Sequence, residues 1–476
     1  MPRLRPLLAG ILLVLLACLG TGAAAAAGQP AGGEELATSA GAFVDSVGVN
    51  LQPADARAGW ALAERLEAAG IRHVRGPAAT GPDDPALAGL RALAGAGLQL
   101  DLAVGAGADP AAAVEAAASL GPAVAALEAP AGEKAMRLRR AVLAHPRLPG
   151  VTVLGRGPGA DHQAVRLDLG GRCPGCVADE LGSGDAAVQV TEVDLGAGVP
   201  DAVAARYLPR LLLANAGLAV RTYVQGQGHD TGPGLLGPGG APTLAYHTVA
   251  RMLALLDDGR RQVAPDRLAF RLTGDTGAVR HRLLQKADGH FWLALWVEEP
   301  GWDPAAGQEL AVPGRQVRVV LDTPVAGARA FVPELGTGPE RSFTDPPGAG
   351  RPLDRLDLEV TDRVLLVELL PRRADGAAPR ATTPPPEPAP ADPAAQDPVV
   401  AGAGQAVTPT TAAAADPAAA RAAAAGRPAG AEDPASRAPL AFTGSTALSM
   451  LVASVLLMLV GWAALFASRR RYHHRH

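Results

Sequence analysis

The chain has 476 residues, with 43 Lys and Arg against 47 Asp and Glu, which gives a formal net charge of -4. This length accommodates one large domain and several appended segments. Basic residues form no block between the two ends of the chain, so the charge pattern argues against nucleic acid as a partner.

The first residues have the three parts of a secretory signal peptide. Arg3 and Arg5 supply a positive start, residues 7–19 an apolar core, and residues 23–27 a small-residue cleavage region. We therefore expect residues 1–27 to be removed on export. A membrane anchor is the alternative, but about a dozen apolar residues are too few to span a bilayer.

The C-terminal end combines a short motif, an apolar run at residues 447–467 and a basic tail at residues 468–476. About twenty apolar residues can cross the hydrocarbon core, and a basic tail resists translocation. The sequence therefore predicts one transmembrane helix at residues 447–467. The motif before it is Leu440-Ala441-Phe442-Thr443-Gly444.

This motif resembles the LAxTG variant of the cell-wall sorting signals that sortases recognise, a variant typical of actinobacterial surface proteins. The Ala-, Gly- and Pro-rich composition, with far more Arg than Lys, agrees with a high-GC genome. The resemblance implies that a sortase cysteine cleaves between Thr443 and Gly444 and transfers the Thr443 carbonyl to a peptidoglycan amine. Sortase and peptidoglycan are thus the expected partners, and the cell surface the expected location. A plain tail anchor is the alternative.

Residues 373–439 are rich in Ala, Pro, Thr, Asp and Gly and contain no Leu, Met or aromatic residue. Such a segment cannot bury enough apolar surface to offset its ordering entropy, so we expect a disordered stalk. Its reach is about 50 Å as a coil and up to about 200 Å in polyproline-like conformation.

The chain contains three cysteines, and Cys18 lies in the predicted signal peptide, where it only loosely resembles a lipoprotein lipidation site. Cys173 and Cys176 remain in the mature chain. Outside the membrane, a pair at this spacing is expected to form a disulfide that staples a loop. The same spacing suits redox chemistry or half of a zinc site, but no second Cys/His pair and no strand-and-helix context is apparent. The sequence therefore predicts neither a metal nor a cofactor.

Between residues 42 and 258, short β-rich runs alternate with helical segments, the pattern of a parallel α/β fold. Eight such runs predict a (β/α)8 TIM barrel. A doubly wound sheet is the alternative, but no Gly-rich phosphate loop follows the first strand. The candidate strands are Ser46–Asn50, Ile71–Gly76, Leu98–Gly105, Val124–Ala129, Val151–Gly155, Ala164–Gly170, Val188–Asp194 and Leu218–Gln225.

From residue 259 to residue 372, alternating runs separated by Gly and Pro turns predict a C-terminal antiparallel β-sandwich. The last of these runs is Leu356–Leu370. Trp292 and Trp296 fall on one face of a predicted strand at His290–Val297. They are either a sugar-stacking platform or part of the core, and core is the commoner role of two such aromatics.

Catalytic residues of TIM barrels project from the carboxyl ends of the strands. Glu128 closes the fourth predicted strand, Asp168 the sixth, and Glu192 lies at the end of the seventh. Carboxylates on the fourth and seventh strands can meet across the barrel mouth. A separation of about 5 Å would permit retaining glycoside hydrolysis, with one acid/base and one nucleophile.

An ordered set of short segments resembles glycoside hydrolase family 39 and its clan of 4/7 barrels, over residues 42–372. The resemblance implies that Glu192 is a nucleophile and that polysaccharide is a ligand. The segments are Val47-Gly48-Val49-Asn50, Gly70-Ile71-Arg72-His73-Val74-Arg75, Leu127-Glu128-Ala129-Pro130, Val190-Thr191-Glu192, Arg221-Thr222-Tyr223, Gly234-Leu235-Leu236 and Leu283-Leu284-Gln285-Lys286.

The sequence departs from that family at three strand ends. Ala131 and Gly132 stand where an Asn-Glu pair with the acid/base is usual, so Glu133 could serve only if the loop has gained a residue. Arg166-Leu167-Asp168 stands where a His-x-Tyr pattern is common, and Val224-Gln225-Gly226 stands where an aromatic and an acidic residue are usual. Losing the general acid alone removes about 10²- to 10⁴-fold of rate.

These departures favour a glycosidase-like head that contacts carbohydrate with weak or no catalysis. One alternative is an active retaining glycosidase that uses Glu192 and Glu133. A second is a structural surface protein or adhesin that binds no sugar.

The predicted anchoring gives one test. Replacing Thr443 with Ala keeps the backbone carbonyl but removes the threonine side chain of the motif that the sortase would recognise, so the Thr443→Ala chain should shift from the wall fraction to the membrane fraction or the medium. Immunoblotting of fractionated cells measures the shift. A variant as firmly wall-bound as the parent would disprove the sorting signal.

Overall fold

The computed structural model describes residues 32–52, 60–81, 83–129, 133–157, 159–182, 187–228, 232–259, 261, 264–343 and 352–372. The predicted signal peptide, stalk, LAFTG motif and transmembrane helix lie outside these residues. Within them, no helix is both long and apolar enough to cross a membrane.

Eight parallel strands close into a barrel in the order β10-β3-β4-β5-β6-β7-β8-β9. This confirms the predicted barrel, and the pairing of the first and last strands excludes a doubly wound open sheet. The strands are β3 (Val47–Asn50), β4 (His73–Pro77), β5 (Gln99–Ala103), β6 (Val124–Glu128), β7 (Thr152–Gly155), β8 (His162–Asp168), β9 (Val188–Asp194) and β10 (Thr222–Gln225).

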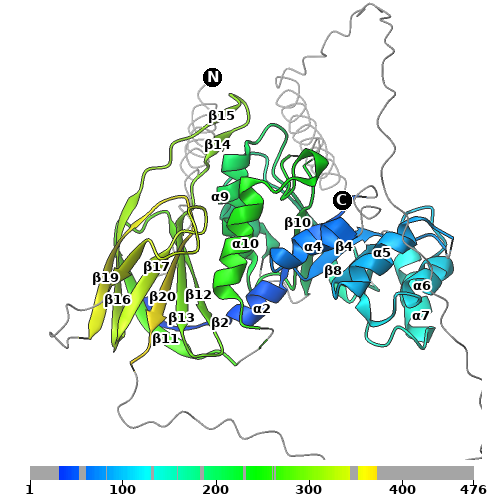
Figure 1. The fold of residues 1–476 in the computed structure, drawn as a ribbon, viewed down its shortest axis with the longest axis horizontal. Coiled ribbons are helices and arrows are strands. Elements are labelled where there is room, and N and C mark those ends of the chain that lie inside the picture. The colour runs from blue at the N-terminus through cyan, green and yellow to red at the C-terminus, as the bar shows by residue number, and fades with distance from the viewer. Residues whose placement is uncertain are drawn as a thin grey trace, which may run out of the picture. The chain divides into compact units, whose positions relative to one another are not determined.

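Helices follow seven of these strands and cover the barrel (Figure 1). Between β7 and β8 the described residues contain no helix. Strand β8 begins beside the carboxyl end of β7, where His162 pairs with Leu154. The chain therefore does not have to run back to the amino end of β7 before β8 starts, and no helix is needed for that return. The helices are α4 (Trp60–Ala68), α5 (Ala86–Gly95), α6 (Pro110–Ala118), α7 (Glu133–Ala144), α8 (Pro174–Ala178), α9 (Asp201–Asn215) and α10 (Leu244–Leu256).

A short helix, α2 (Ala40–Asp45), lies at the amino end of the barrel directly before β3. Phe43 is buried in the barrel core. Asp45 Oδ1 lies 3.1 Å from Nε2 of the buried His73 on β4. This hydrogen bond from His73 lowers the pKa of Asp45 because it favours the charged carboxylate. The contact fixes α2 to the second barrel strand.

Two sheets form the rest of the described chain, with orders β1-β11-β16-β19 and β18-β17-β20-β13-β12-β2. Their strands pair antiparallel, as the sequence predicts, except that β2 pairs with β12 in parallel. A separate hairpin pairs β14 (Trp302–Asp303) with β15 (Gln308–Glu309). The strands of the sheets are β1 (Gly32–Leu36), β2 (Thr38–Ser39), β11 (Arg267–Gly274), β12 (Val279–Gln285), β13 (Phe291–Val297), β16 (Arg315–Val325), β17 (Gly327–Phe331), β18 (Arg341–Phe343), β19 (Leu353–Val360) and β20 (Leu365–Leu370).

The sandwich differs from the sequence prediction in two respects. Strands β1 and β2 precede the barrel in the chain yet pair with β11 and β12. The last predicted run, Leu356–Leu370, is two strands, β19 and β20, that belong to different sheets. Both differences arise from long-range pairing, which local periodicity does not record.

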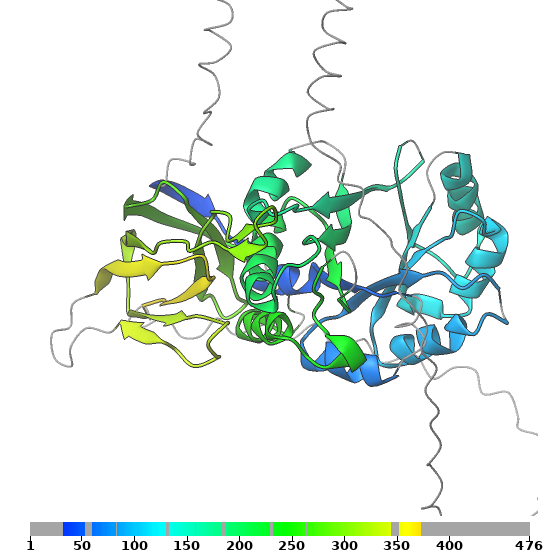
Figure 2. The same cartoon turned by 90° about the horizontal axis from the view of Figure 1, so that it is seen from above.

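Strand β13 is buried on both faces. Trp292 and Trp296 belong to the core shared with the barrel helices, whereas the alternate residues Leu293 and Leu295 belong to the core between the sheets. Both tryptophans are less than 5 % exposed, so they are core residues and not a sugar platform. Figures 1 and 2 show α9 and α10 between the barrel and the six-stranded sheet.

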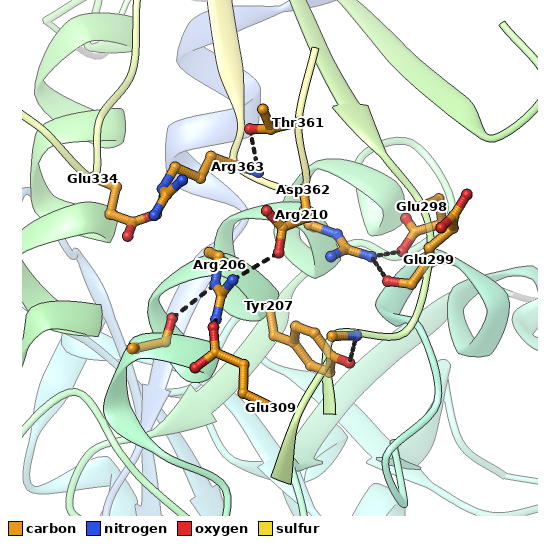
Figure 3. Close-up of polar contacts among 12 residues, drawn as sticks. Arg206, Tyr207, Arg210, Glu298, Glu299, Glu309, Glu334, Thr361, Asp362 and Arg363 are labelled. Atoms are coloured by element: carbon orange, nitrogen blue, oxygen red, sulfur yellow. Dashed lines mark hydrogen bonds and ion pairs between the residues drawn. The ribbon is translucent and has the colours of Figure 1, made fainter. Parts of the chain in front are cut away.

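Helix α9 carries the polar contacts that join the two folds (Figure 3). The fully buried Arg210 forms an ion pair with Glu298 and donates to the Glu299 carbonyl at 3.0 Å. Arg206 forms ion pairs with Glu309 and, at 2.9 Å, with Asp362. Removing one partner of such a pair would leave the other as an unpaired charge away from water, so the buried contacts need both the helix residue and its partner in the sandwich.

Replacing Arg210 with Met should lower the free energy of unfolding by about 3–5 kcal/mol, since Glu298 stays buried without its cation. Urea unfolding of the full chain measures the change. The matched control is Arg271→Met, because Arg271 pairs with Asp322 at 3.2 Å on the surface and should cost less than about 1 kcal/mol. Equal losses in the two variants would contradict the interface described above.

The Asp45 contact predicts a pH dependence. In the folded state the pKa of Asp45 lies below its ordinary value. The stability that the Asp45 carboxylate adds to the fold is therefore fully present above the ordinary pKa and is lost as pH falls through the folded pKa. Wild type should therefore be more stable than Asp45→Asn above about pH 5, and the two should converge by about pH 2. Urea unfolding across this range measures the difference; parallel curves would refute the linkage.

Candidate functional site

A continuous chain of polar side chains crosses the carboxyl end of the barrel. Arg75 in the middle of β4 donates from Nε to Glu128 Oε2 and from a terminal nitrogen to Asn50 Oδ1, each at 2.7 Å. Asn50 donates to Gln225 Oε1 at 3.4 Å, and Gln225 donates to Glu192 Oε1 at 3.2 Å. Each amide accepts on one side and donates on the other, so one set of amide orientations satisfies the whole chain.

Arg166 on β8 completes this arrangement at the seventh barrel strand. It lies 3.5 Å from Glu192 Oε1 and 2.8 Å from Asp194 Oδ2. The hydrogen bond with Asp194 raises the pKa of Arg166. Because arginine only donates, the oxygens of Glu128 and Glu192 that face Arg75 and Arg166 act as acceptors. We call the six residues Asn50, Arg75, Glu128, Arg166, Glu192 and Gln225 the mouth cluster.

An irregularity in β9 places Glu192 in the mouth cluster. Val190 pairs with Val165 but Glu192 pairs with Arg166, so Thr191 is an extra residue in the strand. In regular alternation, residues 189 and 192 would point to opposite faces. Because the bulge adds one residue between them, the side chains of residues 189 and 192 both point to the barrel interior. Thr191 is buried and donates its hydroxyl to the Val165 carbonyl at 3.3 Å.

Beneath the mouth cluster, a second polar layer fills the barrel. Asp101 Oδ2 accepts from the Tyr223 hydroxyl at 2.6 Å and from Gln189 Nε2 at 2.5 Å, and all three residues are buried. Burial raises the pKa of Tyr223 well above its ordinary value. The ring lies over Gly48, where a Cβ atom would be 2.5 Å from Tyr223 Cδ1. Only glycine fits there, and the filled layer forms the floor of the mouth.

The structure places the sequence-predicted residues unequally. Glu128 and Glu192 both belong to the mouth cluster, joined through Arg75, Asn50 and Gln225. Glu133 is the first residue of α7, and its side chain is outside the described set. Asp168 ends β8 and is exposed, and among the described residues no side-chain hydrogen bond or ion pair joins it to the cluster. Residues 440–444 lie outside the described chain.

Cys173 and Cys176 form a disulfide with a Cα–Cα distance of 5.3 Å. The expectation that this pair lacks a strand-and-helix context is wrong. Cys173 follows β8 closely and is the N-cap residue of α8. The context was hidden in the sequence because the helix has only five residues and carries a Pro-Gly pair.

The sequence interpretation named Glu128 and Glu192 as candidate catalytic residues and Arg166 and Gln225 only as departures from a family pattern, and it gave no role to Asn50 and Arg75. Asn50, Arg75 and Gln225 each end or nearly end a predicted strand, so the rule that barrel sites lie at the carboxyl ends points to them too. Arg166 gave a different signal, since it replaced a residue usual in the family that the chain resembles.

Chemically, the mouth cluster is suited to hydrogen bonding with hydroxyl groups. Glu192 and Arg166 are 23 % and 43 % exposed at their side chains, and the amides and guanidinium groups offer both donors and acceptors. Retaining hydrolysis needs one carboxyl group that gives a proton to the leaving oxygen and a second that attacks the sugar. In this arrangement Glu128 accepts from Arg75 through Oε2, and Glu192 accepts from Gln225 through Oε1.

No family model and no curated protein sequence matches the chain. Several solved structures are similar in fold. A family 39 glycoside hydrolase from the gut symbiont Bacteroides cellulosilyticus WH2 is 14% identical, with 70% of this chain and 82% of that chain covered and a TM-score of 0.49. A GH30 endoxylanase from Clostridium papyrosolvens C71 is 8% identical, with coverages of 72% and 98% and a TM-score of 0.41. A GH30 subfamily 8 xylanase from Clostridium acetobutylicum is 10% identical, with coverages of 71% and 97% and a TM-score of 0.37. This likeness concerns the fold alone.

Proposed function

We propose that the chain is a cell-surface protein whose glycosidase-like barrel binds carbohydrate at the mouth cluster without hydrolysing it. The observation that carries this proposal is the hydrogen-bonded chain from Glu128 to Glu192, in which an arginine lies against each glutamate. Such a cluster can hold sugar hydroxyls, since each of its groups presents a fixed donor or acceptor.

The proposed lack of hydrolysis rests on the contacts of Glu128 and Glu192. Retaining hydrolysis needs one carboxylate free to attack the anomeric carbon and a second group able to donate a proton. Glu192 accepts from Gln225 and lies beside Arg166, and Glu128 accepts from Arg75. Neither arginine can act as the proton donor in place of a glutamate, because the guanidinium group stays charged at any ordinary pH.

The proposed location rests on the sequence. The predicted signal peptide, the Pro- and Ala-rich segment at residues 373–439 and the LAFTG motif with its apolar run and basic tail together support export and attachment to peptidoglycan by a sortase. The stalk would carry the barrel and sandwich away from the membrane surface, where polysaccharides are the abundant polymers.

Glycan-array binding by the full chain tests the proposal. Replacing Gln225 with Ala interrupts the mouth cluster and should weaken the retained glycans at least about tenfold, or roughly 1.4 kcal/mol. The matched control is Gln308→Ala, an exposed glutamine of β15 in the sandwich, which should bind as the parent does.

The same preparations are assayed for release of reducing sugar from each retained glycan, and we expect none above a no-protein blank. Release that disappears in Glu192→Gln would establish the active glycosidase instead. Neither binding nor release from any glycan would leave a structural spacer or adhesin as the function.

A further inference from the structure

We propose that Cys176 is a thiol-exchange site, at which a small-molecule thiol opens the disulfide to Cys173 and loosens the hold of the barrel on the sandwich. This inference is independent of the carbohydrate proposal. The first observation is a difference in access: Cys176 is exposed, whereas Cys173 is only 4 % exposed.

Access decides which sulfur is attacked. A thiolate attacks one sulfur of a disulfide along the line of the S–S bond and displaces the other sulfur, so it must be able to reach the sulfur that it attacks. Cys176 offers such an approach and Cys173 does not. The external thiolate therefore forms a new S–S bond to Cys176 Sγ, the original bond breaks, and Cys173 leaves as a thiolate that takes a proton. A second external thiol then releases Cys176, so two thiols become one small-molecule disulfide and the protein gains two thiols.

The residue between the cysteines ties the disulfide to the interface. A Cβ atom on Gly175 would lie 2.8 Å from Glu298 Cδ, so α8 packs directly on this buried carboxylate. Glu298 is the partner of Arg210, and it also accepts from Trp296 Nε1 at 2.6 Å. The segment that the disulfide constrains therefore covers the central ion pair of Figure 3.

Two further contacts hold the same segment on the sandwich. Asp179, which begins the short helix η2 (Asp179–Leu181), binds Arg280 of β12 at 3.0 and 2.5 Å. A Cβ atom on Gly171 would lie 2.6 Å from Pro304 Cγ, beside the β14–β15 hairpin. We call residues 171–181 the clamp. The disulfide lies at the middle of the clamp, so opening it removes a covalent constraint between the two contact points.

The exchange site is mapped on the full chain carrying Cys18→Ser, so that only the pair can react. Reduced glutathione at about 1–10 mM, which opens exposed, labile disulfides but not ordinary structural ones, is applied without denaturant. The sample is quenched with acid and digested, and glutathione adducts are located by mass spectrometry. We expect the adduct on Cys176. An adduct on Cys173, or a disulfide that resists glutathione until the protein unfolds, would overturn the proposal.

The effect on the clamp is measured by amide hydrogen exchange before and after reduction. Exchange in residues 171–181 should accelerate at least about tenfold, while strands β16 and β19 stay unchanged. Unchanged exchange in the clamp would contradict its control by the disulfide.

A pair of glycine variants tests the coupling without altering either cysteine. Gly175→Ala pushes α8 away from Glu298 and should speed glutathione adduct formation several-fold. Gly107→Ala is the control, because a Cβ atom there meets nothing within 4 Å. Equal rates in these two variants would show that the disulfide and the Glu298 contact are unrelated.

Discussion

The guanidinium group of Arg75 joins the carboxyl ends of three barrel strands. It binds Glu128 on β6 and Asn50 on β3 at once, and Asn50 passes the chain of hydrogen bonds through Gln225 to Glu192. A planar, permanently charged group with donors in fixed directions is suited to this bridging role. Arg75 therefore links the polar side chains that run from Glu128 to Glu192 across the mouth.

The barrel below and beside the mouth is built to keep that geometry. Asp101, Gln189 and Tyr223 fill the interior beneath it, and the bulge at Thr191 turns Glu192 inward. On the outside, α9 presents Arg206 and Arg210 to the sandwich, and the clamp adds the contacts of Gly175 and Asp179. The sandwich thus holds α9 in place through ion pairs with Arg206 and Arg210. Helix α9 directly follows β9, the strand that bears Glu192.

The sequence predicts the larger elements well and the mouth less well. Eight β-rich runs at regular spacing indicate the barrel, because burial on both faces demands continuous apolar strands. The pairing of β1 and β2 with the C-terminal sheets, and the separation of β19 from β20, depend on partners far along the chain. The mouth cluster has the same origin: Asn50, Arg75 and Gln225 lie in strands that meet only after closure. The CxxC segment shows a further limit, since a five-residue helix has too few turns to give a period.

The central claim is that neither strand-end glutamate attacks a sugar. The most direct measurement is the intact mass of the full chain after incubation with activated 2-deoxy-2-fluoroglycosides of the sugars it binds, which trap the covalent intermediate of retaining hydrolysis. An unchanged mass with every compound is the predicted result. A gain of one glycosyl group, mapped to Glu192, would contradict the account.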